Sequence, residues 1–329
     1  MSKSNQLVEL SQSGKPFIIY KSQTGFDLYT NFSKKIVLNN KNIQSFLKKK
    51  HKKKIKNTDL YIGFFGYELL NNLIDIKLPK QKGLNFPKGI FYKPEKKIKL
   101  SNNLNHFEKD FETGSFKINI NEKSYTKIFN RFKKKIKRGE TYQIKICTKY
   151  KTKSKIDPLD FFSRLSKTNL APEAFMIKDN NYSIVSCSPE NLITKKGSEI
   201  STKPIAGTVK KTKNLNKSKA LNYFRKNLKE TKEHNMIVDM ERNDLSRICK
   251  IGSVRLSKQK IVEEYKDLFH YVSLIRGKLR KNINNVDIIK AMMPGGSVIG
   301  CPKINTLNLL NNQEKENRNI YTGSFGYIK

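Results

Sequence analysis

The 329-residue sequence contains few cysteines, and none of them lie close together. Cys147, Cys187, Cys249 and Cys301 form no C-x-x-C pair. A metal or disulfide framework needs closer or more numerous partners. We therefore expect reduced thiols in an intracellular protein.

Long apolar runs and internal repeats are also absent. Residues 1–20 contain no apolar segment of the kind found in signal peptides, and no run of 18 apolar residues occurs anywhere in the sequence. We expect a cytoplasmic protein with no membrane partner. The length permits one large domain or two of ordinary size.

Acidic residues and arginine are both scarce relative to lysine. The 67 Lys and Arg residues stand against 28 Asp and Glu, which gives a formal net charge of +39. Such a charge suggests a polyanion partner, and a basic nucleic-acid-binding protein is the alternative of another class. Nucleic-acid surfaces more often gather Arg and aromatic side chains in one patch, whereas these lysines are spread along the chain. The densest cluster, Lys48–Lys56, is typical of a solvated segment, so we expect no specific nucleic-acid partner.

The order of the predicted elements favours an α+β fold. Short β-type runs fill the first 118 residues, and apolar spacing predicts a helix over Tyr125–Lys137. Residues 141–150 alternate as a strand does, with Gln143 as a polar group on one face. The remaining predicted elements are strands within 174–197, one long helix over Lys217–Asn243, a short helix over Asn284–Met293 and a last strand at 321–328. Strands precede, interleave with and follow helices without a βαβ rhythm, which indicates an antiparallel architecture.

Three glycines and two prolines interrupt the segment MMPGGSVIGCPK, Met292–Lys303, which leads directly into an amphipathic stretch. Gly295 and Gly300 fit the start of a phosphate-binding G-x-x-x-x-G-K-[ST] loop, but Cys301 and Pro302 stand where that loop requires Lys and Ser or Thr. A nucleotide P-loop is therefore disfavoured. Backbone N–H groups at a helix start favour an anion, either a carboxylate or a phosphate. The alternative is a Gly-rich turn without a ligand.

Two carboxylates in the segment KETKEHNMIVDMERNDLSRIC suggest a metal site. Glu230 and Glu233 are three residues apart, so a helix sets both on one face. Paired carboxylates suit Mg²⁺, which takes oxygen ligands. The alternative is a solvated helix face with internal ion pairs.

Three further positions are candidates for a ligand site. Glu190 follows a strand and Pro189, where a side chain can project into a cleft. At Gly207, next to Thr208, the backbone can approach a ligand closely. His270 is either structural or a proton-transfer group, since the pKa range of histidine suits proton transfer.

Taken together and in this order, seven segments resemble the chorismate-utilising enzymes, a family that includes aminodeoxychorismate synthase component I and anthranilate synthase component I. The segments are GETYQI, SCSPENL, KPIAGT, EHNMIVDMERNDLSRIC, HYVSLIRGKL, MMPGGSVIGCPK and YTGSFGYI. The resemblance covers about residues 120–329, with YIGFFGYELL as a weaker similarity upstream. It implies an α+β fold in which two antiparallel sheets pack as a sandwich with flanking helices. It also implies an N-terminal strand-rich subregion, 1–118, packed on a chorismate-binding catalytic core, 119–329.

The resemblance implies roles for the candidate residues. Glu230 and Glu233 match the metal and acid positions of the family, with Mg²⁺ as the cofactor. Catalytic or ring-lining roles are implied for Glu233, His270, Glu190 and Gln143. Substrate-binding roles are implied for Gly207, Thr208, Tyr321, Gly295, Gly296, Ser297 and Lys303.

The resemblance also implies a reaction of chorismate with ammonia or water. Family members that add water carry a lysine base at the position of Gln143, and glutamine cannot act as that base, so the ammonia-using branch is favoured. The chain has no G-x-C-x-G-type glutaminase elbow, which predicts ammonia from a separate glutamine amidotransferase subunit. The segment DMERNDL and the lack of an LLES-like segment favour 4-amino-4-deoxychorismate, the precursor of p-aminobenzoate and folate. Ala206 stands where many aminodeoxychorismate synthases have lysine, and it favours the alternative, anthranilate and pyruvate for tryptophan synthesis.

The family pattern continues beyond Tyr327 through an arginine that grips a carboxylate, a GAGIV strand-turn and a second metal-binding glutamate. None of these follows in this sequence. From the resemblance we expect a truncated chain that is weakly active or inactive. A noncatalytic remnant that only docks the glutaminase is a third interpretation.

Overall fold

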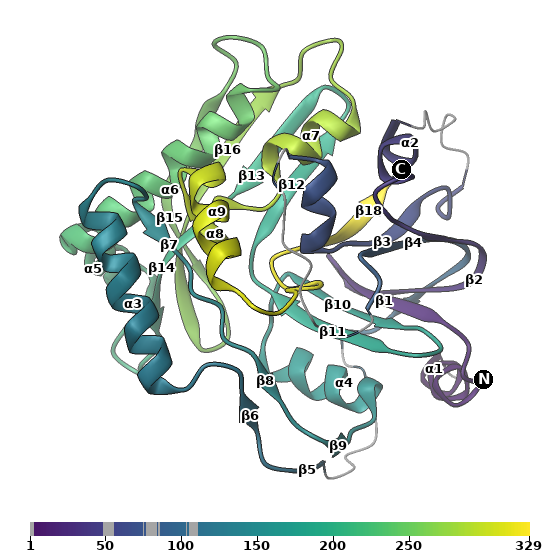
Figure 1. Ribbon diagram of the computed structural model, residues 1–329. Helices are drawn as coiled ribbons and strands as arrows, with labels where there is room; N and C mark the ends of the chain where they lie inside the picture. The colour runs from purple at the N-terminus through teal and green to yellow at the C-terminus, as the bar shows by residue number, and fades with distance from the viewer. Residues whose placement is uncertain are drawn as a thin grey trace.

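Two antiparallel sheets with helices around them form the structure, a computed structural model that describes residues 3–48, 56–74, 76, 84, 86–102, 104 and 111–329 (Figure 1). The larger sheet has the strand order β11-β10-β1-β2-β4-β3-β18, so strands from both ends of the chain lie side by side. Its strands are β1 (Phe17–Ser22), β2 (Gly25–Val37), β3 (Tyr61–Phe65), β4 (Gly89–Leu100), β10 (Glu173–Lys178), β11 (Ser183–Ser188) and β18 (Ser324–Ile328). The lysine cluster Lys48–Lys56 lies almost wholly outside the described residues.

The second sheet is built around β16 (Leu268–Lys278), which pairs with three other strands. Its other members are β12 (Asn191–Lys196), β13 (Glu199–Lys203), β14 (Ile205–Lys210) and β15 (Arg255–Glu264). Tyr271, Val272 and Ile275 of β16 are fully buried because helices and strands cover both faces of this central strand. The α+β architecture of two antiparallel sheets with flanking helices, predicted from the sequence, is confirmed.

The helix predicted over Lys217–Asn243 is wrong in one respect, because the chain forms two helices there. They are α5 (Lys217–Lys226) and α6 (Leu228–Ser246). Asn227 between them has φ −83° and ψ 101°, which no α-helix contains, and its side-chain oxygen accepts from the backbone N–H of Lys229 and Glu230. This cap fixes the first turn of α6, which carries the predicted carboxylates.

The remaining helices precede or connect the strands along the chain (Figure 1). They are α1 (Lys3–Gln12), α2 (Ile43–Lys48), the 3₁₀ helix η1 (Tyr67–Asn72), α3 (Glu122–Lys137), α4 (Pro158–Thr168), α7 (Asn285–Met292), α8 (Gly296–Ile299) and α9 (Lys303–Gln313). The helices predicted at 125–137 and 284–293 are confirmed as α3 and α7. Asn121 and Asn284 cap them with side-chain oxygens. None of the helices in the described part of the chain has the length and apolar content needed to cross a membrane.

The strand predicted over residues 141–150 is mostly wrong, because the segment pairs with the Gly-rich turn instead of a sheet. Only two-residue ladders form: β7 (Gln143–Ile144) with β17 (Gly300–Cys301), and β8 (Tyr150–Lys151) with β6 (Lys117–Ile118). A third such ladder joins β5 (Glu112–Thr113) to β9 (Ser154–Lys155). At Gly300, φ is 121° and ψ is −174°, and an added Cβ would lie 1.9 Å from the Gln143 carbonyl oxygen. Only glycine tolerates both that conformation and that approach.

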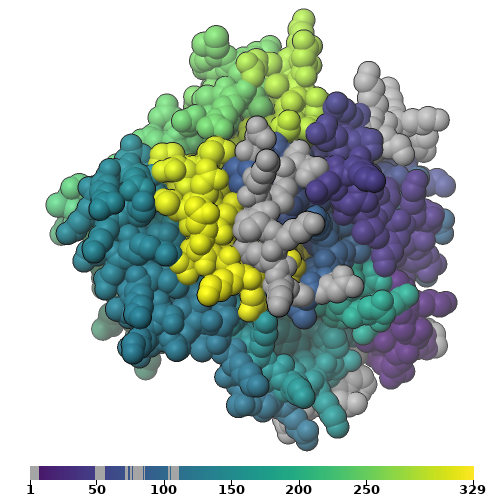
Figure 2. Space-filling model, viewed as in Figure 1, coloured from purple at the N-terminus to yellow at the C-terminus, as the bar shows by residue number. Residues whose placement is uncertain are grey.

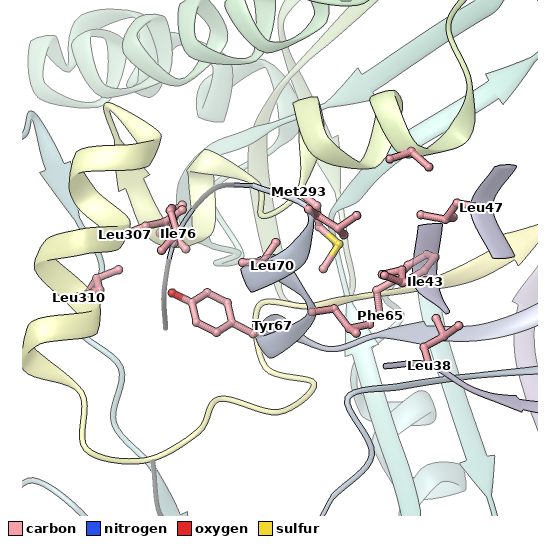
Figure 3. Packing of buried hydrophobic residues seen from close by; sticks show 14 of the residues in the cluster. Leu38, Ile43, Leu47, Phe65, Tyr67, Leu70, Ile76, Met293, Leu307 and Leu310 are labelled. Atoms are coloured by element: carbon pink, nitrogen blue, oxygen red, sulfur yellow. The ribbon is translucent and has the colours of Figure 1, made fainter. Parts of the chain in front are cut away.

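The largest hydrophobic cluster joins the N-terminal third of the chain to the segment around the Gly-rich turn (Figure 3). Tyr67 and Leu70 of η1 face Met293, Leu307 and Leu310 across this cluster, and all five are buried. In the space-filling view the C-terminal segment (yellow) borders the blue-teal surface of α3 and its neighbours (Figure 2). The Gly-rich turn is therefore anchored in a core shared by distant parts of the sequence. The division into subregions 1–118 and 119–329 stays a prediction.

Candidate active site

Glu230 and Glu233 both lie in the N-terminal half of α6 and are half-buried. Gly207 of β14 lies beside the first of them, because an added Cβ at Gly207 would be 3.1 Å from Glu230 Oε2. The pairing of β14 with β16 is irregular here, and Gly207 has φ +109°, in the region that favours glycine. The glycine lets β14 lie close to a carboxylate of α6, and the approach of the Gly207 backbone to a ligand stays a prediction.

Glu233 is held by the segment that crosses the Gly-rich turn. Its Oε1 accepts a hydrogen bond of 2.8 Å from Gln143 Nε2 and lies 3.8 Å from Lys145 Nζ. Backbone bonds from Tyr142 N to Cys301 O and from Lys145 N to Ile299 O fix this segment in place. The structure thus brings Gln143 and Glu233 together. The sequence did not single out Lys145, although strand alternation places it on the same face as Gln143.

Glu190 connects the turn after β11 to two other elements. Its carboxyl accepts hydrogen bonds from the Ser297 side chain and from Ile205 N, the latter at 3.4 Å. Burial raises the pKa of Glu190 above its ordinary value, and the Ser297 bond and the positive charge of Lys145 oppose that rise. Glu190 and Ser297, both predicted site residues, are therefore in contact, and Lys145 is near both Glu190 and Glu233.

A buried charged cluster lies beneath the Gly-rich turn. Lys303 Nζ is 2.6 Å from Asp244 Oδ2 and donates a 2.8 Å hydrogen bond to Ala291 O, and the side chains of Lys303 and Asp244 are each 3% exposed. Glu241, one turn before Asp244 on α6, accepts from the Gly296 N–H. Glu241 was not predicted as a site residue, because no local pattern shows that a carboxylate of α6 is buried against a turn far along the chain. The Lys303 ammonium is paired with Asp244 inside this cluster. Contact between Lys303 and the substrate stays a prediction.

The turn also packs closely on α6 through Gly296. An added Cβ there would lie 1.9 Å from Met240 Sδ, so the absence of a side chain lets the turn rest on the helix. An added Cβ at Gly295 would be 3.2 Å from Leu192 Cδ1 of β12. Gly295, Gly296 and Ser297 therefore lie between α6, β12 and Glu190, and their role in substrate binding stays a prediction.

The Glu241→Gln variant should remove a pH dependence of stability. Burial raises the pKa of Glu241 to about 8, while the charge of Lys303 opposes that rise. A carboxyl whose folded pKa exceeds its unfolded value stabilises the fold at low pH, and this contribution is lost as the pH rises to about 8. Relative to the variant, the wild type should lose up to about 1.4 kcal/mol per pH unit between about pH 5 and pH 8. Urea unfolding at several pH values measures this difference, and parallel curves for the two proteins would contradict it.

His270 and Thr208 face one another across β14 and β16. Thr208 Oγ1 and His270 Nδ1 are 2.9 Å apart, and the two residues are register partners. Burial lowers the pKa of His270. Its hydrogen bond with the Gly207 backbone and the negative charge of Glu263 oppose this decrease. A neutral imidazole is therefore favoured, held in one orientation by the threonine. The structure brings together these two predicted residues with Gly207.

Tyr321 is the predicted site residue whose contacts lie elsewhere. It is 56% exposed, and the Arg318 guanidinium lies 5.9 Å from the centre of its ring. In the described part of the chain its interactions join it to Arg318 rather than to the carboxylates of α6. Its role in substrate binding stays a prediction.

The carboxylates of α6 fit Mg²⁺ as a partial ligand set. Among the described residues no group of three His, Cys, Asp or Glu side chains is placed to hold a metal ion. Mg²⁺ is commonly bound through one or two carboxylates, with water and substrate oxygens completing its octahedron. Glu230 and Glu233 supply two such oxygen donors on one helix face, so their chemistry suits Mg²⁺ together with an oxygen-rich ligand.

Comparison with known proteins gives one consistent family. A family model described as chorismate binding enzyme matches residues 9–329. The aminodeoxychorismate synthase component 1 of Bacillus subtilis is 34% identical over 216 residues, which are 65% of this chain and 46% of that protein. The anthranilate synthase component 1 of Aquifex aeolicus is 31% identical over 265 residues, 80% of this chain and 50% of that protein. The chain thus spans about half the length of these curated relatives.

A solved structure shares the fold. Anthranilate synthase component I from Streptococcus pneumoniae matches with a TM-score of 0.75 at 24% identity. The match covers 95% of this chain and 78% of that one. At this identity the likeness concerns the fold, which agrees with the two-sheet architecture described above.

Proposed function

The chain belongs to the family of chorismate binding enzymes, and on that premise we propose that it aminates chorismate with ammonia to give 4-amino-4-deoxychorismate. The family resemblance seen in the sequence is confirmed, and with it membership of an enzyme family. The observation that carries the finer proposal is the 2.8 Å hydrogen bond from Gln143 Nε2 to Glu233 Oε1. It places an amide beside the carboxylate proposed as the acid, at the position where the water-adding branch of the family carries a lysine base.

Gln143 supports ammonia as the nucleophile. A carboxamide does not take up a proton at neutral pH, so it cannot activate water. Ammonia is itself a nucleophile and needs no base to attack. The amide instead orients Glu233, and this arrangement suits amination better than hydration.

Glu233 is proposed as the general acid. A hydroxyl is a poor leaving group unless it receives a proton as its bond breaks, and a positioned carboxylic acid can deliver that proton. Glu190, whose pKa is raised by burial, and the neutral His270 are proposed to line the ring of the substrate. Gly207 and Thr208 are proposed to contact the ring through backbone and hydroxyl, since both lie next to these groups.

Mg²⁺ is the proposed cofactor. Glu230 would hold it as an ionised carboxylate, and Glu233 would act as a metal ligand only in its deprotonated form, after it has given its proton to the leaving hydroxyl. When bound, the ion supplies positive charge that holds a substrate carboxylate and offsets negative charge in the transition state. The residues of this chain then orient the ring and move the proton.

The ammonia is proposed to come from a separate glutamine amidotransferase subunit. The curated relatives are named as component 1 of their synthases, which supports a second component for this chain as well. Ammonium salt replaces such a partner in an assay, so the reaction can be tested on the single chain.

Anthranilate synthesis is the second candidate, and Ala206 is the observation that favours it. Ala206 is buried, and its carbonyl oxygen accepts a 3.0 Å hydrogen bond from His234 Nδ1. No amine lies on the side chain at this position to form a covalent bond with the substrate. Relatives of both names match this chain, so product identity must decide between the two reactions.

One incubation tests both candidates. The 329-residue chain is mixed with chorismate, Mg²⁺ and ammonium salt, and the products are separated by chromatography with fluorescence detection. A species that becomes p-aminobenzoate only after a lyase is added supports the main proposal. Anthranilate formed directly supports the second candidate. Unchanged chorismate contradicts amination by this chain and supports the noncatalytic interpretation.

A further inference from the structure

Lys145 occupies a central position among the carboxylates of the candidate site. Its backbone N–H donates to Ile299 O at 2.9 Å, which fixes it to the Gly-rich segment. Its side chain points to α6, with Nζ 3.8 Å from Glu233 Oε1. Its charge also acts on Glu190, whose raised pKa it opposes. One ammonium group therefore lies near two carboxylates that come from different elements.

The site described above is rich in carboxylates. Glu190, Glu230 and Glu233 all lie in it, whereas the proposed substrate is itself a dicarboxylate. A second anion enters such a site only if positive charge offsets the repulsion. A cation of the chain that a ligand can reach is therefore needed in addition to any metal ion.

Lys145 and Lys303 both lie close to carboxylates of the site or of the cluster beneath it, and they differ in whether a ligand can reach them. Lys303 is 3% exposed and forms a 2.6 Å ion pair with Asp244, so its charge is already used. Lys145 is 43% exposed, and at 3.8 Å its contact with Glu233 is too long for a hydrogen bond. The Lys145 ammonium can therefore turn to a ligand without breaking a hydrogen bond to Glu233.

We propose that Lys145 binds a carboxylate of the substrate and so determines the affinity of the site for dianionic ring compounds. This inference rests on the proposed function, because chorismate supplies the carboxylate. A charge-assisted hydrogen bond of this kind is strong enough to change affinity by about 10- to 100-fold. A lysine that only forms an exposed ion pair with Glu233 would leave the affinity unchanged when removed.

Equilibrium binding of chorismate to the 329-residue chain tests the proposal without turnover. Isothermal titration calorimetry in the absence of ammonia compares the wild type with Lys145→Met, which keeps the apolar stem and removes the charge. We expect Kd to rise about 10- to 100-fold. Lys145→Arg keeps the charge and should stay within about threefold of the wild type.

A matched control is available on the same segment. Lys149 pairs with Glu316 at 3.1 Å, away from the carboxylates of α6, and Lys149→Met should bind chorismate as the wild type does. Higher salt should weaken binding to the wild type more than binding to Lys145→Met, because one screened charge pair is missing in the variant. Thermal melts confirm that each variant is folded.

The possible outcomes separate the inference from the proposed function. An unchanged Kd for folded Lys145→Met, or a Kd for Lys145→Arg as weak as that for Lys145→Met, overturns the role of the Lys145 charge. Chorismate that binds through Lys145 but is never aminated supports the inference and contradicts the proposed function. A wild-type chain that does not bind chorismate overturns both.

Discussion

Replacement of Lys303 by methionine is expected to lower the free energy of unfolding by about 3–5 kcal/mol. Lys303 and Asp244 form an ion pair with both side chains 3% exposed. The variant leaves the buried Asp244 carboxylate beside Glu241 with only the partly exposed Arg247, 3.8 Å from Asp244 Oδ1, as a cation, and a poorly compensated buried charge is costly. The Ala291 carbonyl also loses the hydrogen bond that it accepts from Lys303. Urea unfolding followed by circular dichroism measures the change.

Two further variants show whether burial is the cause. Lys149→Met breaks a partly exposed pair with Glu316, and such pairs contribute at most about 1 kcal/mol. In the double variant Asp244→Leu with Lys303→Met both charges are gone, so it should be more stable than Lys303→Met alone. A loss below about 1 kcal/mol for Lys303→Met would show that the pair is not the anchor of the turn.

The Gly-rich turn contributes both to the stability of the fold and to the geometry of the candidate site. Its underside is fixed to α6 by the Lys303–Asp244 pair, by Glu241 and by Met240 packed against Gly296. The adjoining chain is hydrogen-bonded to the segment that carries Gln143 and Lys145. Because the turn and its adjoining chain contact both α6 and this segment, they set the distance between Glu233 and the side chains that bind it. A shift of the turn is therefore expected to change catalysis as well as stability.

Local patterns predicted the parts of the site that lie within single elements. The spacing of Glu230 and Glu233 predicted one helix face, and both lie on α6. The permissive backbone expected at Gly207 is present as a positive φ and a contact with Glu230. Such features depend on a few neighbouring residues, so the sequence alone shows them.

Only some of the contacts between distant segments could be predicted from the sequence. The family resemblance paired Gln143 and Glu233 in one site, but no spacing rule predicts that hydrogen bond. Lys145 and Glu241 were missed because their importance depends on which segment packs against them. The family resemblance assigned Lys303 to the substrate, and the structure shows its ammonium inside a buried ion pair. The long helix was broken by the Asn227 cap, since a side-chain cap competes with helix continuation.

The Glu233→Gln variant should reduce kcat for amination of chorismate by about 10²- to 10⁴-fold, with a smaller effect on KM. Glutamine keeps the shape of the side chain and still accepts a hydrogen bond from Gln143 Nε2, but it cannot deliver a proton to the leaving hydroxyl. The measurement is steady-state formation of the aminated product at saturating Mg²⁺ and ammonium.

Asp239→Asn is the matched control. Asp239 is on the same helix, and its side chain is 72% exposed and paired with Arg242, so the kcat of this variant should equal that of the wild type. If Glu233→Gln retained kcat within about tenfold of the wild type, the proton would have to come from another group. Glu190, with its raised pKa and its hydrogen bond from Ser297, would then be the acid to test.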